Sequence, residues 1–353
     1  MSELKNILEL WKSAQAAGDA VCLATVVGVQ GSAYRRPGAR MLLTSAGRRA
    51  GTVSGGCLEA EIAKKAWWLT EQGPSVQRYS SFFDDDGDLP YGLGCGGTVV
   101  VLLERGAAAE QHLDALRSSV EERTASVIVT STDTNSPGTV LVLDGVGTLV
   151  YGPDPDADVI GLARETLATR QSRHAGGFFV EFVAPPPSLL IFGAGDDAQP
   201  LVAFAATLGW HVTVADGRSQ LARAERFPQA ARVCGLQPAL AAAGAEDAAV
   251  LMTHSYEQDA LILRALLRPE LLGRALRYLG VLGPRRRTER LVEELAEELG
   301  LTVEAAMARL HSPVGLDLGG HAPATIALSI AAELQAIFAG RPALSLQGQP
   351  VIA

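Results

Sequence analysis

The chain has 353 residues, of which 48% are hydrophobic and 20% charged, and its formal net charge is −9. This composition is typical of a soluble globular protein of about two domains, and it excludes a disordered chain, a coiled coil and a collagen-like repeat. The net negative charge argues against nucleic acid and anionic membranes as partners, and the charged N-terminal segment predicts a core-facing helix rather than a signal peptide, so we expect a cytoplasmic protein.

The first part of the chain, residues 1–184, predicts a mixed α/β domain. Apolar and β-branched runs predict strands over 22–29, 97–104, 126–131 and 139–144 and a hairpin over 39–53, whereas 58–71 and 112–123 have helical patterns. Three consecutive prolines, 185–187, then force extended backbone and mark the clearest boundary in the sequence.

The second part, residues 188–353, alternates between strands and helices. Strands are predicted over 189–192, 211–216, 232–234, 249–253 and 278–282, with helical stretches between them. Such alternation is typical of a parallel sheet with covering helices. We therefore expect an α/β protein with an N-terminal mixed α/β domain followed by a Rossmann-like doubly wound parallel-sheet domain.

A glycine pattern follows the first strand of this second domain. Gly193 and Gly195 stand between that strand and a helix, and Asp216 ends the next strand, where a carboxylate can hydrogen-bond a ribose hydroxyl. The pattern predicts a dinucleotide site in which Asp216 faces the glycine turn with Arg218 beside it. The alternative is that the glycines only form a tight turn, because the two carboxylates at 196–197 would repel an anion.

Two segments place a cysteine among glycines. They comprise Gly55, Gly56 and Cys57, and Gly94, Cys95, Gly96 and Gly97. Glycine lets a ligand reach backbone amides and a thiol, and thiolates suit soft metals and sulfur chemistry. We expect Cys57 and Cys95 to lie near each other at the mouth of one cleft and to contact a soft metal or its sulfur ligands. A buried, apolar role is the alternative, and it is expected for Cys22 and Cys234.

A loop over 31–40 is rich in arginine. Arg35, Arg36 and Arg40 could hold an anionic cofactor tail, since guanidinium groups bind phosphate in bidentate fashion, or the loop could simply be solvated.

Together these segments resemble the xanthine dehydrogenase accessory protein family, also called the XdhC/CoxI family. The shared marks run in order over nearly the whole chain: GSAYRRPGARML, SGGCLE, GLGCGG, IFGAGDDAQPL, MTHSYEQD, LGVLGPRRRTERL and HSPVGLDLGGHAPATIALSIAAEL. Two positions depart from the family pattern. Asp196 stands where many relatives carry histidine, and the residue before Pro323 is not acidic.

The resemblance implies a chaperone that binds molybdenum cofactor, as molybdopterin or its dinucleotide form, with Cys57 and Cys95 as contacts to molybdenum or its sulfido ligand. Such a protein shields the cofactor, assists its sulfuration through a cysteine desulfurase and inserts it into an apo molybdenum hydroxylase of the xanthine dehydrogenase type. The resemblance also implies a homodimer. The apolar stripe of the helix over 323–339 offers a surface for it (Ile326, Ile330, Leu334 and Phe338), although the same stripe could simply pack on its own sheet.

Two other functions are compatible with the residues. An NAD(P)-dependent oxidoreductase would use Gly193, Gly195 and Asp216, with His254 and Asp259 as an acid–base pair, although His254 could equally line a cofactor site. A structural partner of the hydroxylase would bind no cofactor, and the glycine-framed cysteines count against it. We expect a maturation factor rather than an enzyme.

Overall fold

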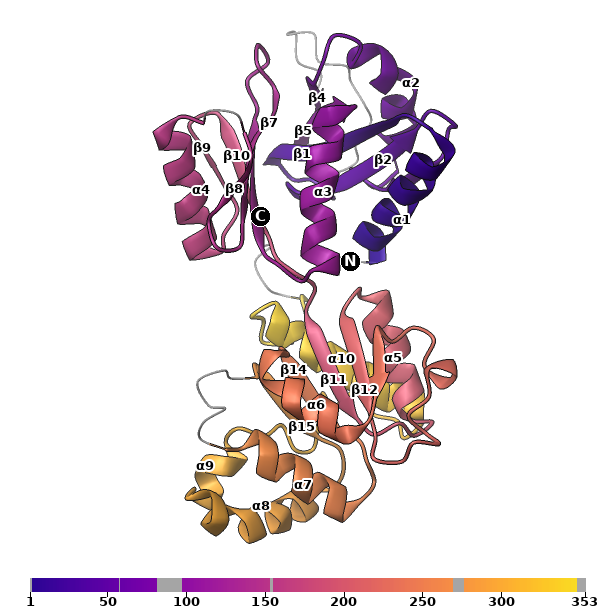
Figure 1. The fold of residues 1–353 in the computed structure, drawn as a ribbon, viewed down its shortest axis with the longest axis vertical. Helices are drawn as coiled ribbons and strands as arrows, with labels where there is room; N and C mark the ends of the chain where they lie inside the picture. The colour runs from indigo at the N-terminus through magenta and orange to yellow at the C-terminus, as the bar shows by residue number, and fades with distance from the viewer. Residues whose placement is uncertain (1, 57, 81–96, 153–154, 269–275, 348–353) are drawn as a thin grey trace. The chain divides into compact units, whose positions relative to one another are not determined.

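The computed structural model describes residues 2–56, 58–80, 97–152, 155–268 and 276–347 (Figure 1). The chain forms two compact units, which we call the N-terminal unit (Glu3–Pro186) and the C-terminal unit (from Pro187 on). The division between the units falls within the proline run.

The N-terminal unit contains a first antiparallel sheet in the order β3-β2-β1-β5-β4. Its strands are β1 (Val21–Gly31), β2 (Arg40–Thr44), β3 (Arg49–Gly51), β4 (Ser75–Ser80) and β5 (Gly97–Arg105). Helix α2 (Glu59–Leu69) packs on one face, and α1 (Ser2–Ala17) and α3 (Ala107–Glu121) pack on the other. Cys22 is fully buried in this sheet as expected, and burial raises the pKa of its thiol to about 12. The other thiol expected to have an apolar role, that of Cys234, lies in the C-terminal unit and is half-buried.

A second antiparallel sheet in the same unit has the order β8-β7-β6-β10-β9. Its strands are β6 (Ser126–Ser131), β7 (Gly138–Asp144), β8 (Leu149–Tyr151), β9 (Arg173–Ala175) and β10 (Phe178–Val183). Helix α4 (Ala157–Thr169) covers one face, and α3 packs on the other, so α3 lies between the two sheets. This helix begins five residues earlier than predicted, because the alanines that precede His112 favour helix strongly.

The C-terminal unit is built on a parallel sheet in the order β13-β12-β11-β14-β15, which confirms the predicted fold class. Its strands are β11 (Ser188–Phe192), β12 (His211–Ala215), β13 (Arg232–Cys234), β14 (Ala248–Leu251) and β15 (Tyr278–Val281). Leu189 and Ile191 point to one face of the sheet, and Leu190 and Phe192 to the other. Both faces are buried, so the strand is apolar throughout.

Helices cover both faces of this sheet (Figure 1). One face carries α5 (Ala198–Thr207) and α10 (Pro323–Phe338), and the other carries α6 (Leu236–Ala242), α7 (Tyr256–Leu266), α8 (Arg285–Leu299) and α9 (Val303–Met307). Two 3-10 turns, η1 (Ala224–Arg226) and η2 (Ala243–Ala245), complete the unit. In the part of the chain that the structure describes, no helix is both long and apolar enough to cross a membrane.

The apolar stripe of α10 lies inside the C-terminal unit. Ile330 and Leu334 are fully buried against the sheet and α5, and Ile326 and Phe338 pack partly against the same core. The stripe therefore packs on its own sheet, which was the alternative expectation, and the prediction that it forms a homodimer surface is wrong. Periodicity identifies the buried face of a helix, but it does not identify what covers that face.

Candidate functional site

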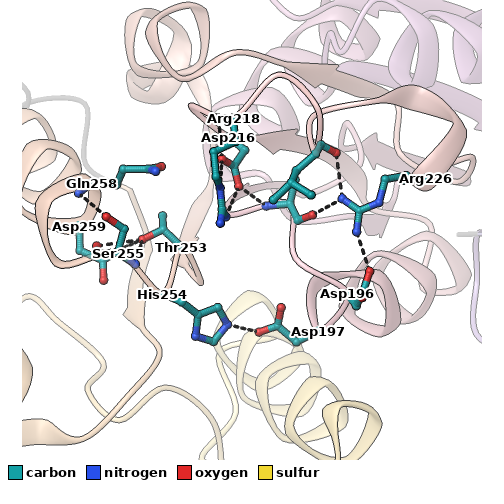
Figure 2. A network of polar contacts seen from close by, with 12 residues as sticks. Asp196, Asp197, Asp216, Arg218, Arg226, Thr253, His254, Ser255, Gln258 and Asp259 are labelled. Atoms are coloured by element: carbon teal, nitrogen blue, oxygen red, sulfur yellow. Dashed lines mark hydrogen bonds and ion pairs between the residues drawn. The ribbon is translucent and has the colours of Figure 1, made fainter.

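The C-terminal ends of β11, β12 and β14 form the candidate nucleotide site. In doubly wound sheets, ligands bind outside the carboxyl ends of the strands where the strand order reverses, which here is between β11 and β14. Figure 2 shows the polar residues that follow these strands and the contacts among them. We call this region the strand-end crevice.

Gly193 is required by the close approach of two strands. Its φ is +120°, and a Cβ at this position would overlap the carbonyl oxygen of Met252 and lie 2.9 Å from the Thr253 amide nitrogen. At Gly195 a Cβ would meet only the side chain of Asp197, which can move. The first glycine of the pattern therefore has a structural reason that is independent of any ligand.

Asp216 faces the glycine turn with Arg218 beside it, as predicted. Its Oδ2 accepts hydrogen bonds from the Ala194 amide and Arg218 Nη2, both at 2.8 Å, and its Oδ1 accepts from Arg218 N at 2.8 Å and Nε at 2.9 Å. Burial alone would raise the pKa of Asp216, but the hydrogen bonds from Arg218 and Ala194 hold it below the ordinary value of 3.8. The buried carboxylate is therefore ionised and fully hydrogen-bonded at neutral pH.

Each of the two carboxylates at the start of α5 has a basic partner. Arg226 Nη2 lies 2.6 Å from Asp196 Oδ1, and Arg226 Nη1 donates to the Ala194 carbonyl at 2.6 Å. His254 Nε2 lies 2.7 Å from Asp197 Oδ2. The sequence predicted that the carboxylates of Asp196 and Asp197 would repel an anion, and these pairings offset that repulsion. Sequence reasoning missed Arg226, because its place at the end of the short 3-10 turn η1 carries no recognisable pattern.

His254 occupies a left-handed backbone conformation, with φ of 56°. Thr253 Oγ1 accepts a hydrogen bond from the amide of the residue after His254 and donates to Asp259 Oδ1 at 2.6 Å. Arg287 Nη1 donates to Asp259 Oδ2 at 2.6 Å. Asp259 is thus buried, and each of its carboxylate oxygens accepts a hydrogen bond. The proposed acid–base pair of His254 and Asp259 is therefore not formed, since His254 contacts Asp197 instead.

In the N-terminal unit, the three glycine-containing segments converge at the exit of β1. Gly97 pairs with Gly31 across the first sheet, and a Cβ at Gly97 would overlap the carbonyl oxygen of Ser32. Gly55 packs against the ring of Tyr34, which would lie 3.6 Å from a Cβ there. The residues 32–34 thus contact both cysteine-bearing segments. Four predicted site residues of these segments lie outside the described part of the chain: Cys57, Gly94, Cys95 and Gly96.

A buried carboxylate holds the segment before α2. Glu59 Oε1 accepts the amides of Val53 at 3.1 Å and Ser54 at 2.8 Å, and Glu59 Oε2 accepts the Ser54 hydroxyl at 2.7 Å. The hydroxyl in turn accepts the amides of Gly56 and Leu58. Burial alone would raise the pKa of Glu59, but the hydrogen bonds from Ser54 and Val53 keep it below the ordinary 4.5. The sequence indicated only an acidic residue in the first helical turn.

The arginines of the loop over 31–40 have separate environments. Arg35 pairs with Glu3, whereas Arg36 is exposed. Arg40 is only 7% exposed and forms an ion pair with Glu181 of the second sheet. The expectation that this loop offers three arginines to an anion is therefore wrong for Arg40, which has a structural role.

We expect Glu59→Gln to destabilise the N-terminal unit by about 1–3 kcal/mol, the cost of leaving buried polar groups without partners. Both lone pairs of the Ser54 hydroxyl are already used, so a glutamine NH₂ group would face it without an acceptor. Because the folded pKa of Glu59 is lowered, its stabilisation exists above about pH 4.5 and is lost as pH falls through the folded pKa.

Urea unfolding between pH 3 and pH 7 measures this effect. The matched control is Glu9→Gln, which removes an exposed pair with Lys5 in α1 of the same unit and should change stability little. Equal stability of Glu59→Gln and the control at pH 7 would contradict the assigned role of Glu59.

In comparisons with known proteins, family models match a segment of each unit. A family model described as the XdhC Rossmann domain matches residues 189–334, and one described as the XdhC and CoxI family matches residues 14–80. A Bacillus subtilis (strain 168) protein, named as a probable xanthine dehydrogenase subunit, is 33% identical over 321 residues, covering 88% of this chain and 91% of the relative.

Two further relatives extend over nearly the whole chain. An Escherichia coli (strain K12) protein named molybdenum cofactor insertion chaperone PaoD is 27% identical, covering 94% of this chain and 88% of the relative. The crystal structure of a Bacillus halodurans protein described as a xanthine dehydrogenase is 29% identical, with a TM-score of 0.75 and coverage of 98% of both chains.

Proposed function

The chain belongs to the XdhC and CoxI family, and we propose that it binds molybdenum cofactor and inserts it into an apo molybdenum hydroxylase of the xanthine dehydrogenase type. The observation that carries this proposal is the similarity, over 94% of the chain, to a relative named as a molybdenum cofactor insertion chaperone. In this proposal the cofactor is cargo that the protein holds and releases.

The geometry of the N-terminal unit supports a place for the metal end of the cofactor. The segments that carry Cys57 and Cys95 both contact residues 32–34, and thiolates are suitable partners for molybdenum and sulfur. Tyr34 is 77% exposed although Gly55 covers part of its ring, so an open ring face could stack on a planar pterin. We assign the metal and pterin to this loop cluster, together with Arg35 and Arg36.

The strand-end crevice of the C-terminal unit, taken by itself, has groups that suit an anionic ligand. Arg218, Arg226 and His254 surround the glycine turn, and their cationic or donor groups suit a phosphate. We propose that Gly193 and Gly195 give such a phosphate access to the turn. The competing NAD(P)-dependent oxidoreductase has less support, since the acid–base pair assigned to it is not formed.

Gentle anaerobic purification followed by metal analysis and mass spectrometry tests the proposal. We expect molybdenum and molybdopterin to co-purify with the full chain and to pass to an apo hydroxylase, restoring its activity. We also propose that a cysteine desulfurase supplies sulfur to the bound cofactor, which a labelled-sulfur transfer assay measures. Bound NAD(H) or NADP(H) in place of molybdopterin would contradict the chaperone function.

We expect a homodimer, because a cofactor that must be sheltered during transfer favours an enclosed site. Light scattering at micromolar concentration measures the mass of the particle. A species of 37 kDa, the mass of a single chain, would contradict this expectation.

A further inference from the structure

Asp216 has no acceptor position left for a ligand. In dinucleotide folds, the acid at this place, the end of the second strand, binds the ribose hydroxyls through its oxygens. A carboxylate offers about four lone-pair sites. Here the four are taken by donors of the protein itself: the Ala194 amide and the N, Nε and Nη2 of Arg218.

Arg218 provides three of these four donors and covers the carboxylate from the solvent side. The Arg218 side chain is 39% exposed, whereas that of Asp216 is 0% exposed. The two residues are separated only by Gly217, and the guanidinium binds both carboxylate oxygens (Figure 2). A bidentate pair of this kind is both strong and geometrically specific. The negative charge of Asp197 also favours a cation at Arg218.

We propose that Arg218 is a specificity-determining residue. Its guanidinium occupies the lone pairs of Asp216 that would accept the ribose hydroxyls, and the C-terminal unit therefore rejects NAD(H). An entering ribose must either displace a bidentate guanidinium or leave its own hydroxyls without an acceptor, and both are unfavourable. The hydrogen bond from the Ala194 amide to Asp216 would remain, because this amide belongs to the glycine turn. This inference concerns the crevice alone and does not depend on molybdenum cofactor.

Electrostatics and hydrogen bonding predict opposite results for removal of Arg218. NADH carries a negatively charged diphosphate, so deleting a cation from the crevice should weaken its binding if charge alone mattered. If Arg218 instead blocks Asp216, Arg218→Ala frees lone pairs on both carboxylate oxygens for the ribose diol. We then expect NADH to bind about tenfold more tightly than to the parent, which corresponds to two ordinary hydrogen bonds.

The test is titration of the full-length protein with NADH, followed by nicotinamide fluorescence and calorimetry. Arg218→Lys serves as a second variant, because it keeps the charge but cannot bind both oxygens and should show a smaller gain. The double variant Arg218→Ala/Asp216→Ala should lose the gain. Arg223→Ala, which removes an exposed arginine paired with Glu225 in the same unit, should leave NADH affinity unchanged.

Two results would overturn the proposal. One is that the folded single variants bind NADH no more tightly than the parent. The other is that the gained affinity survives in the double variant, since the gain would then not come from Asp216. Either result is distinguishable from failure of the chaperone function, which is measured by bound molybdopterin and not by NADH.

Discussion

Replacing Glu181 with alanine is expected to lower the free energy of unfolding of the N-terminal unit by about 3–5 kcal/mol, the usual cost of removing one partner of a buried ion pair. Glu181 lies on β10 of the second sheet and pairs with Arg40 on β2 of the first. The side chains of Arg40 and Glu181 are only 8% and 12% exposed. Without Glu181, the guanidinium stays buried and loses its ionic partner.

A neighbouring histidine limits how far Arg40 can rearrange after Glu181 is removed. Arg40 Nε and Nη2 lie 3.2 and 3.0 Å from His112 Nε2. Guanidinium nitrogens only donate, so His112 Nε2 must accept and its proton must be on Nδ1, which lies 3.0 Å from Glu104 Oε2. Glu104 Oε1 accepts the Thr139 amide from the second sheet at 2.8 Å. The network thus connects both sheets and α3, and its members constrain one another.

Urea unfolding of the full chain, followed by tryptophan fluorescence, measures the effect. Three of the four tryptophans, at positions 11, 67 and 68, belong to the N-terminal unit, so this signal reports mainly on its unfolding. The control is Asp114→Ala, which removes an exposed partner of Arg117 and should cost less than about 1 kcal/mol. A Glu181→Ala variant as stable as this control would contradict the structural role of the pair.

The fold of the C-terminal unit follows closely from its sequence. Its strands are short apolar runs between helices, and parallel pairing of consecutive units leaves few alternatives once the alternation is recognised. The N-terminal unit is different, because its two sheets depend on long-range antiparallel pairing. Strand β1 pairs with β5, whose partner residues are 66 to 83 positions further along the chain. Strand β6 pairs with β10, and α4 lies between these two strands in the sequence. No local pattern specifies such partners, so the second sheet was not predicted.

The candidate site shows a similar limit at the level of side chains. The spacing from Gly193 to Asp216 correctly predicted that the acid faces the glycine turn, because strand length and order determine that position. It could not predict that Arg218 saturates the carboxylate, since this depends on a rotamer and not on a pattern. The same holds for Glu59, whose role depends on a hydroxyl and two amides that meet only in the folded loop.

The second large effect is expected for the cysteines of the glycine-framed segments. Cys57→Ala and Cys95→Ala should each lose most of the bound molybdopterin, because an alanine methyl group offers no substitute for a thiolate contact to molybdenum or its sulfido ligand. The described neighbours of both residues converge on residues 32–34, which supports one common site. Folding should change little, within about 0.5 kcal/mol, since substitutions in glycine-rich loop segments remove few packing contacts.

Cys22→Ala is the matched control with the opposite expectation. Its thiol is fully buried between the first sheet and α2, so the variant should lose about 1 kcal/mol of stability and retain its cofactor. Melting temperature and bound molybdopterin are measured in parallel for the parent and the three variants. If Cys57→Ala and Cys95→Ala hold as much cofactor as the parent, the thiols are not ligands. Cofactor binding would then depend on the backbone amides around Gly55 and Gly97 and on Arg35 and Arg36, and substitution of these two arginines would become the decisive test.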